Sequence, residues 1–111
     1  MSKDLLNLNE LLDCISKIKL YSSEFTIADD FYHDHKSFDA TMMQFVVIGE
    51  IIYRLTDNFK EINKHIPWQK IKNFRNIIAH DYFGIDADEI WDIINNKLIP
   101  LEKDISILLN D

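Results

Sequence analysis

The 111-residue sequence is poor in the residues that make tight turns. It contains only two glycines and two prolines, and a sheet protein of this size needs more positions able to adopt hairpin-turn conformations. Hydrophobic residues make up 47% of the chain, which is enough for one small core. These proportions predict a single all-α domain over residues 1–111, an up-and-down helical bundle of four to five helices.

Two further absences bear on location and redox chemistry. No apolar run approaches the length needed to span a membrane, and the first residues lack the charged stretch and long apolar run of a secretory signal. We therefore expect a cytoplasmic protein with no membrane partner. The single cysteine, Cys14, has no partner for an internal disulfide. Because it falls on an apolar helical stripe, it is expected to be a buried structural thiol.

Positive charge is scarce overall but locally concentrated. The net charge of −7 argues against a general nucleic-acid coat protein, because phosphate contacts need a concentration of Lys and Arg. Residues 54–80, however, carry six cationic side chains against two acidic ones. A local basic face of this kind suits a protein that holds RNA at one place, with Lys70 and Lys72 as candidate RNA-binding residues. A solvated lysine-rich helix face is the alternative explanation.

Apolar residues recur at spacings of three and four along most of the chain, which predicts helices. We expect them over residues 4–21 and 26–35, from 37 or 38 to 55 or 56, from 67 to 80 or 82, and from 86 onward. Residues 57–66 are polar and are expected to be irregular. Pro100 lies within the last apolar pattern, where it removes a backbone hydrogen bond, so a kink near residues 96–100 is expected rather than two separate helices.

Residues suited to helix ends mark several of these boundaries. Thr26 and Asp86 each precede an acidic residue by three positions, and each can cap the helix that follows. Pro67 stands where proline is best tolerated, at the first position of a helix. Gly84 is expected to end the preceding helix in a left-handed conformation.

The segment from Phe74 to Tyr82 carries the most informative chemistry. Cleavage of RNA without a metal needs a group that moves a proton, and histidine, with an unperturbed pKa near neutrality, does so as acid or base. The reaction also needs positive charge on the phosphate, which arginine supplies through a planar fork of donors. His80 and Arg75 are therefore the candidate catalytic residues.

Helical geometry limits how these two side chains can meet. In an ideal helix, residues five apart such as Arg75 and His80 point about 140° away from each other. They converge only if the helix ends at His80 or if a second protomer contributes to the site. Asn76 lies one turn before His80 and can orient the imidazole or a phosphate. The structural alternative has Arg75 paired with Glu50 or Asp81, and His80 favoured simply by the helix C-terminus.

Acidic side chains raise two further questions. Glu50 stands in an apolar run after Gly49 and needs a cation, either Arg54 one turn on or Arg75 across the bundle. The second pairing would make Glu50 a supporting residue that positions Arg75, and the first is an equally good explanation. A separate cluster of two aspartates and two histidines is too incomplete to predict a metal site, and no metal or cofactor is expected; its members are Asp29, Asp30, His33 and His35.

Four segments in order resemble the HepT-like toxins of the HEPN superfamily of helical ribonucleases. The similarity spans about two thirds of the chain, from Phe38 to the end. A bare arginine and histidine five residues apart would match many proteins by chance, whereas four segments in order would not. The matching segments are Ile48-Gly49-Glu50, Ile66-Pro67-Trp68, Arg75-Asn76-Ile77-Ile78-Ala79-His80-Asp81-Tyr82 and Ile90-Trp91.

This resemblance implies a metal-independent endoribonuclease toxin of a type II or VII-like toxin–antitoxin system. It implies a homodimer whose two motif helices build a composite cleft for RNA, with no DNA substrate expected. It further implies a minimal nucleotidyltransferase antitoxin that transfers AMP to Tyr82 and blocks the site with a bulky anion. The alternative is a non-catalytic helical subunit that binds and regulates a nucleotidyltransferase.

Overall fold

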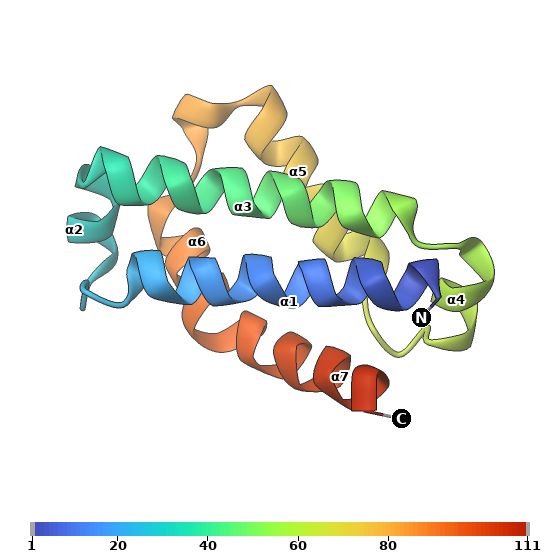
Figure 1. The fold of residues 1–111 in the computed structure, drawn as a ribbon. Helices are drawn as coiled ribbons and strands as arrows, with labels where there is room; N and C mark the ends of the chain where they lie inside the picture. Colours follow the sequence, from blue (N-terminus) through green and yellow to red (C-terminus); the bar gives the residue numbers. More distant parts are fainter. Residues whose placement is uncertain (1, 111) are drawn as a thin grey trace.

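The chain folds as an up-and-down bundle of helices, as the sequence predicts. The computed structural model describes residues 2–110, and no strand occurs among them. Four long helices alternate in direction along the bundle (Figure 1). They are α1 (Lys3–Ser22), α3 (His35–Arg54), α5 (Trp68–His80) and α7 (Leu98–Asn110).

Short elements connect the long helices. Two six-residue helices, α2 and α4, stand before and after α3. A 3-10 turn, η1, follows α5, and a π-helical turn, η2, joins α6 to α7. Their bounds are α2 Ala28–His33, α4 Asp57–Ile62, η1 Tyr82–Gly84, α6 Ala87–Asp92 and η2 Ile93–Lys97.

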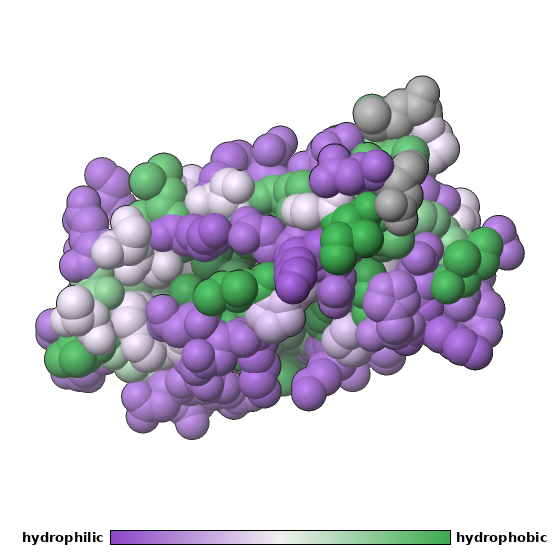
Figure 2. Space-filling model, turned by 90° about the horizontal axis from the view of Figure 1, so that it is seen from below, coloured by the Kyte–Doolittle hydropathy of each residue, from purple (hydrophilic) through white to green (hydrophobic). Residues whose placement is uncertain are grey.

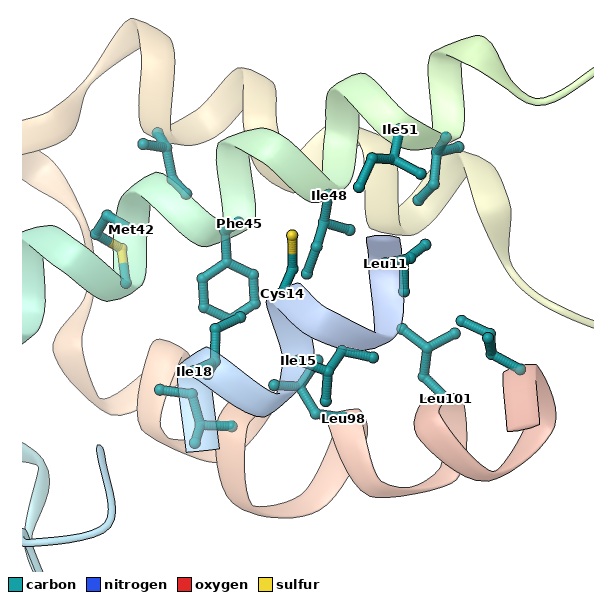
Figure 3. Close-up of a cluster of buried hydrophobic side chains, with 14 of the residues drawn as sticks. Leu11, Cys14, Ile15, Ile18, Met42, Phe45, Ile48, Ile51, Leu98 and Leu101 are labelled. Atoms are coloured by element: carbon teal, nitrogen blue, oxygen red, sulfur yellow. The ribbon is translucent and has the colours of Figure 1, made fainter. Parts of the chain in front are cut away.

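The core lies mainly where α1 meets α3 and α7 (Figure 3). Its side chains are almost all aliphatic or aromatic, and many are completely shielded from solvent. Cys14 is part of this cluster, so the prediction of a buried thiol is confirmed, and burial raises its pKa. The labelled core residues of α1 are Leu11, Cys14, Ile15 and Ile18, which face Met42, Phe45, Ile48 and Ile51 of α3 and Leu98 and Leu101 of α7.

The start of α3 shows where sequence patterns misplace a cap. Asp34 caps this helix, because its carboxylate accepts a hydrogen bond from the Ser37 backbone nitrogen. The helix therefore begins at His35, two residues earlier than expected, and α2 ends at His33. Thr26 does not cap α2; the N-cap residue is Ile27, which makes no side-chain capping bond.

The expectation of an irregular segment after α3 is wrong for residues 57–62, although residues 63–66 do form turns. Residues 57–62 form α4, and the Thr56 hydroxyl caps it by accepting from the Phe59 backbone nitrogen at 3.2 Å. Thr56 is itself held by Asp4 of α1, whose carboxylate accepts from the Thr56 backbone nitrogen at 2.9 Å and from its hydroxyl at 2.7 Å. A contact across 52 residues thus starts this helix.

The predicted left-handed cap at Gly84 is also wrong. None of the described glycines has a positive φ. The helix instead ends because Asp81 leaves the helical region at φ −150° and ψ 67°. The Asp81 carboxylate then accepts from the Gly84 backbone nitrogen at 3.1 Å, which closes the 3-10 turn. A Cβ on Gly84 would overlap that carboxylate, so a larger residue there would require the Asp81 side chain to move.

The C-terminal helix tolerates its proline by changing its winding. Asp86 caps α6, as predicted, by accepting from the Asp88 and Glu89 backbone nitrogens. Helical structure then continues without interruption through the π turn η2 into α7, and the path bends there (Figure 1). Wider winding just before Pro100 relieves its clash with the preceding turn. The predicted distortion is therefore present, three residues earlier than expected.

The surface mixes polar and apolar side chains. From the α7 side, the molecule is mainly hydrophilic, with separate hydrophobic patches (Figure 2). Ile99 and Ile107 of α7 are 58% and 50% exposed. Among the described residues, no helix is long and apolar enough to cross a membrane.

Candidate active site

Helix α5 carries the predicted catalytic residues and packs antiparallel to α3. The close approach of the two helices depends on Gly49. A Cβ built on Gly49 would lie 2.5 Å from the Arg75 Cβ and 2.9 Å from its Cγ. Real side chains do not come so close, so any larger residue at Gly49 would push α5 away. The aliphatic part of Arg75 therefore lies directly against the α3 backbone.

Arg75 is held in place by the neighbouring residue of α3. Its Nη2 lies 3.3 Å from Glu50 Oε1, and its Nη1 donates to Asn76 Oδ1 at 3.3 Å. Glu50 therefore pairs with Arg75 across the two helices, while Arg54 pairs with Glu10 at 3.6 Å. Of the two pairings the sequence left open, the inter-helix one is present.

The guanidinium is only partly satisfied by these contacts. The side chain of Arg75 is 38% exposed, and its Nε is buried without a hydrogen-bond partner among the described residues. A buried donor without an acceptor carries an unmet desolvation cost. An anion that reached the exposed terminal nitrogens would therefore bind a cation that is already partly stripped of water.

His80 stands apart from this cluster. It is the last residue of α5 and is exposed. Among the hydrogen bonds and ion pairs of residues 2–110, none joins His80 to Arg75 or to Asn76. Since α5 remains helical through His80, the two candidate catalytic side chains point about 140° apart within one chain. Asn76 contacts Arg75 rather than the imidazole, so a single protomer does not bring arginine and histidine together.

Tyr82 has a partner that sequence patterns did not indicate. In η1, two residues after α5 ends, its hydroxyl donates a hydrogen bond to the Asp39 carboxylate of α3. Burial, followed by the hydrogen bond and the negative charge of Asp39, raises the pKa of the Tyr82 phenol above its ordinary value. Asp39 is an exposed carboxylate on an amphipathic helix, and only the tertiary contact distinguishes it from its neighbours.

The two predicted RNA-binding lysines lie on different sides of α5. Lys72 lies one turn before Arg75, and its ammonium group is 4.9 Å from the centre of the Tyr53 ring of α3. Lys70 lines a hollow of about 340 Å³ formed by α3, α5, α6 and α7. Lys72 therefore lies on the same side of α5 as Arg75, whereas Lys70 lies on the other side.

Two of the four candidate metal ligands, His33 and Asp29, contact each other. His33 Nδ1 lies 3.4 Å from Asp29 Oδ1, within one turn of α2. Over residues 2–110, no group of three or more histidine, cysteine, aspartate or glutamate side chains is arranged to hold a metal ion.

A partly desolvated guanidinium and an exposed imidazole on one helix are groups whose chemistry suits a phosphodiester. Comparison with protein families specifies the class of protein. Residues 11–108 match the family described as "Ribonuclease HepT-like". The chain therefore belongs to the HepT-like ribonuclease family, as its motif segments predicted.

Individual relatives agree with this family. The chain is 33% identical over 106 residues to a "Putative RNase" of Methanocaldococcus jannaschii, covering 94% of this chain and 85% of that protein. It is 26% identical over 95 residues to a "Probable ribonuclease HepT" of Thermococcus cleftensis, with 86% of each chain covered.

A third relative is longer. It is a "Gamma-glutamylcyclotransferase and putative RNase" of Methanocaldococcus jannaschii, 31% identical over 112 residues. The match covers all of this chain but only half of that protein. No solved structure matches the chain with significance.

Proposed function

We propose that this chain is a metal-independent endoribonuclease and the toxin of a toxin–antitoxin pair. In this proposal His80 moves the proton, Arg75 stabilises the phosphate, and Asn76 and Glu50 hold Arg75 in position. The observation that carries it is the state of Arg75, which is fixed by Glu50 and Asn76 yet keeps exposed terminal nitrogens and an unpartnered Nε. Membership of the HepT-like ribonuclease family supports the choice of RNA as substrate.

The roles follow from the chemistry of the two groups. A 2′-hydroxyl that attacks the neighbouring phosphorus must lose its proton, and the departing 5′-oxygen must gain one. An exposed imidazole can perform either transfer, which typically contributes about 10²–10⁴-fold to the rate. Negative charge builds on the phosphoryl oxygens during the attack, and the Arg75 fork offers them two donors.

The site is proposed to form between two copies of the chain. Arg75 and His80 project from α5 in directions about 140° apart, so one protomer cannot direct both at a single phosphate. In a two-fold dimer that pairs the α5 helices, Arg75 of one protomer can face His80 of its partner. This arrangement uses both residues without requiring α5 to unwind.

Silencing is proposed to occur by AMP transfer to Tyr82 from a minimal nucleotidyltransferase antitoxin. Tyr82 follows His80 by two residues, and its hydroxyl lies at the surface of α3. An added nucleotide would bring a bulky negative charge to the end of α5. It would compete with the RNA phosphate for the same cations.

Cleavage of labelled RNA in the presence of EDTA tests the proposed reaction. We expect the wild type to cut, whereas His80→Ala loses about 10²–10⁴-fold and Arg75→Ala about 10²–10³-fold in rate. His65→Ala and Arg54→Ala are matched controls, since each removes the same kind of side chain elsewhere. Equal activity in all five proteins, or activity that EDTA abolishes, would contradict the proposal.

Mixing the two inactive variants tests the shared site. In a heterodimer of Arg75→Ala and His80→Ala, one composite site keeps both residues and the other loses both. Random mixing makes half of the dimers mixed, so activity should recover to about a quarter of the wild-type rate. No recovery would mean that each protomer needs its own pair.

The second candidate is a non-catalytic subunit that binds a nucleotidyltransferase. The bond from Tyr82 to Asp39 favours it, because this contact orients the tyrosine hydroxyl independently of RNA cleavage. Expression without the antitoxin separates the two candidates. If the wild type is as harmless to growth as His80→Ala, the regulatory subunit is the better description.

A further inference from the structure

The bond between Tyr82 and Asp39 joins two elements that are 43 residues apart in the sequence. Tyr82 lies in the 3-10 turn η1, and Asp39 lies in the second turn of α3. Phe38 of α3 packs edge-on against the phenol, with ring centres 6.2 Å apart, whereas Phe83 is 94% exposed. The hydroxyl is therefore directed at the carboxylate by packing on the α3 side.

The surroundings of this hydroxyl keep it protonated. The groups that face it from the packed elements are Asp39 of α3 and Tyr32 of α2. Burial raises the pKa of Tyr82 most, and Asp39 and Tyr32 raise it further. A phenol must lose its proton to become an effective nucleophile. Spontaneous ionisation is thus disfavoured here, and a base that receives the proton during the reaction is required.

We propose that Asp39 is the proton acceptor that allows Tyr82 to be modified by a nucleoside triphosphate. The inference rests on the proposed function, in which the antitoxin delivers AMP to this tyrosine. Asp39 already accepts the hydrogen bond from the hydroxyl, so proton transfer needs no rearrangement of either side chain. Its exposure leaves it able to pass the proton on to solvent.

The step balances without any further reactant. The Tyr82 oxygen forms a bond to the α-phosphorus of ATP, and the bond from that phosphorus to the bridging oxygen breaks. Pyrophosphate leaves with the electron pair of the broken bond. The phenolic proton moves to the Asp39 carboxylate and then to water. The products are the tyrosyl phosphodiester of AMP, pyrophosphate and one proton.

Asp39 could instead act only as an anchor that orients the ring. Asp39→Asn separates the two roles, because an amide oxygen still accepts the hydroxyl hydrogen bond but cannot take its proton. The same change removes the negative charge that raises the Tyr82 pKa, which by itself favours ionisation. If Asp39 is the base, Asp39→Asn should slow AMP transfer. If Asp39 acts only by raising the Tyr82 pKa, the variant should speed AMP transfer.

The experiment measures AMP incorporation at Tyr82 by mass spectrometry, with ATP and a minimal nucleotidyltransferase of the kind proposed as the antitoxin. The variants are Asp39→Asn, Asp39→Glu and Tyr82→Phe. Asp13→Asn, which removes an exposed carboxylate from α1, is the matched control. Circular dichroism and thermal unfolding establish that each variant is folded. All rates are measured from neutral to alkaline pH and expressed as a ratio to wild type, so that titrations of the antitoxin cancel.

We expect Asp39→Asn to lose about 10²-fold at neutral pH, the lower end of what a positioned base contributes. The loss should shrink as pH rises, because hydroxide increasingly takes the proton in place of Asp39. Asp39→Glu should recover part of the rate, Asp13→Asn should match wild type, and Tyr82→Phe should take no AMP.

Three results would overturn the inference. An Asp39→Asn rate equal to or above wild type shows that the carboxylate is not the acceptor. A loss that stays constant across the pH range shows an anchor only. If wild-type Tyr82 takes no AMP while the antitoxin is active on ATP, the proposed silencing by AMP transfer fails as well. This result is recognised in the wild type alone, before any Asp39 variant is compared with it.

Discussion

The two faces of α3 are built on different principles. On the side of α1, Ile51 of α3 and Ile15 and Ile18 of α1 are fully buried aliphatic side chains with no exposed surface. On its other side, beside α5 and η1, α3 also makes polar contacts with Arg75 and Tyr82 that remain partly open to solvent.

This difference separates stability from function. Burial of a large aliphatic side chain contributes about 1.5–3 kcal/mol, whereas a solvent-exposed ion pair contributes about 0–1 kcal/mol. The Glu50–Arg75 and Asp39–Tyr82 contacts therefore add little to the stability of the folded state, and they are better explained by the groups they hold in position. Two substitutions and one titration test this difference between the two sides of α3.

The largest effect on stability is expected on the α1 side. Ile15→Ala empties a fully buried position and should lower the free energy of unfolding by about 2–5 kcal/mol, measured by urea denaturation. The folded fraction should cut RNA at the wild-type rate, because the contacts of Arg75 and Tyr82 are untouched. Ser16→Ala, at the exposed neighbouring position, should change stability by no more than about 0.5 kcal/mol. A loss of RNA cleavage in the folded fraction of Ile15→Ala would contradict the separation of stability from function.

An intermediate effect is expected where the two helices touch. Gly49→Ala places a Cβ 2.5 Å from the Arg75 Cβ, so α5 must move outward. Overpacking of this kind costs about 1–3 kcal/mol, less up to about 1 kcal/mol gained from the better helix propensity of alanine. RNA cleavage should fall further than stability, because Arg75 moves with α5.

Comparing the two variants at matched stability sharpens that test. If Gly49→Ala and Ile15→Ala lose activity only in proportion to their unfolded fractions, Gly49 is a packing residue with no part in positioning Arg75. Retention of the wild-type rate in Gly49→Ala would show that the guanidinium tolerates the displacement.

The smallest effect is expected from ionisation of Tyr82. Its pKa is higher in the folded chain than the ordinary value of about 10. The resulting stabilisation is fully present below that ordinary value and is lost as pH rises through the folded-state value. The tyrosinate absorbance of wild type minus that of Tyr82→Phe isolates this group. It should titrate above the ordinary range, and in Asp39→Asn it should shift only partly back, since burial is the first cause. Titration together with the other tyrosines would contradict the contact.

Sequence patterns located most helices but not all of their ends. The long amphipathic stretches predict α1, α3 and α5 within a few residues, because the helical period of apolar side chains is a local property. The cap of α6 at Asp86 was equally local. By contrast, α4 begins where Asp4 holds Thr56, and that bond spans 52 residues.

In the candidate site, too, some features could be predicted from short segments of sequence and others depend on contacts between distant residues. The residue types of Arg75, His80 and Tyr82 and their spacing identified the functional segment, and their assignment as site residues stays a prediction. Glu50 was one of two pairing possibilities that spacing could not separate. Asp39 carried no signal, because an exposed aspartate near the start of an amphipathic helix is ordinary.

The sequence alone therefore determined the helical class, the family, and the helix on which an arginine and a histidine lie. These depend on local periodicity and on residue identity within short segments. Only the tertiary structure decided that Glu50 pairs with Arg75 rather than with Arg54, and that Asp39 accepts the hydrogen bond of the Tyr82 hydroxyl. Such pairings depend on how closely α3 and α5 approach, which is set by a glycine contact between residues far apart in the chain.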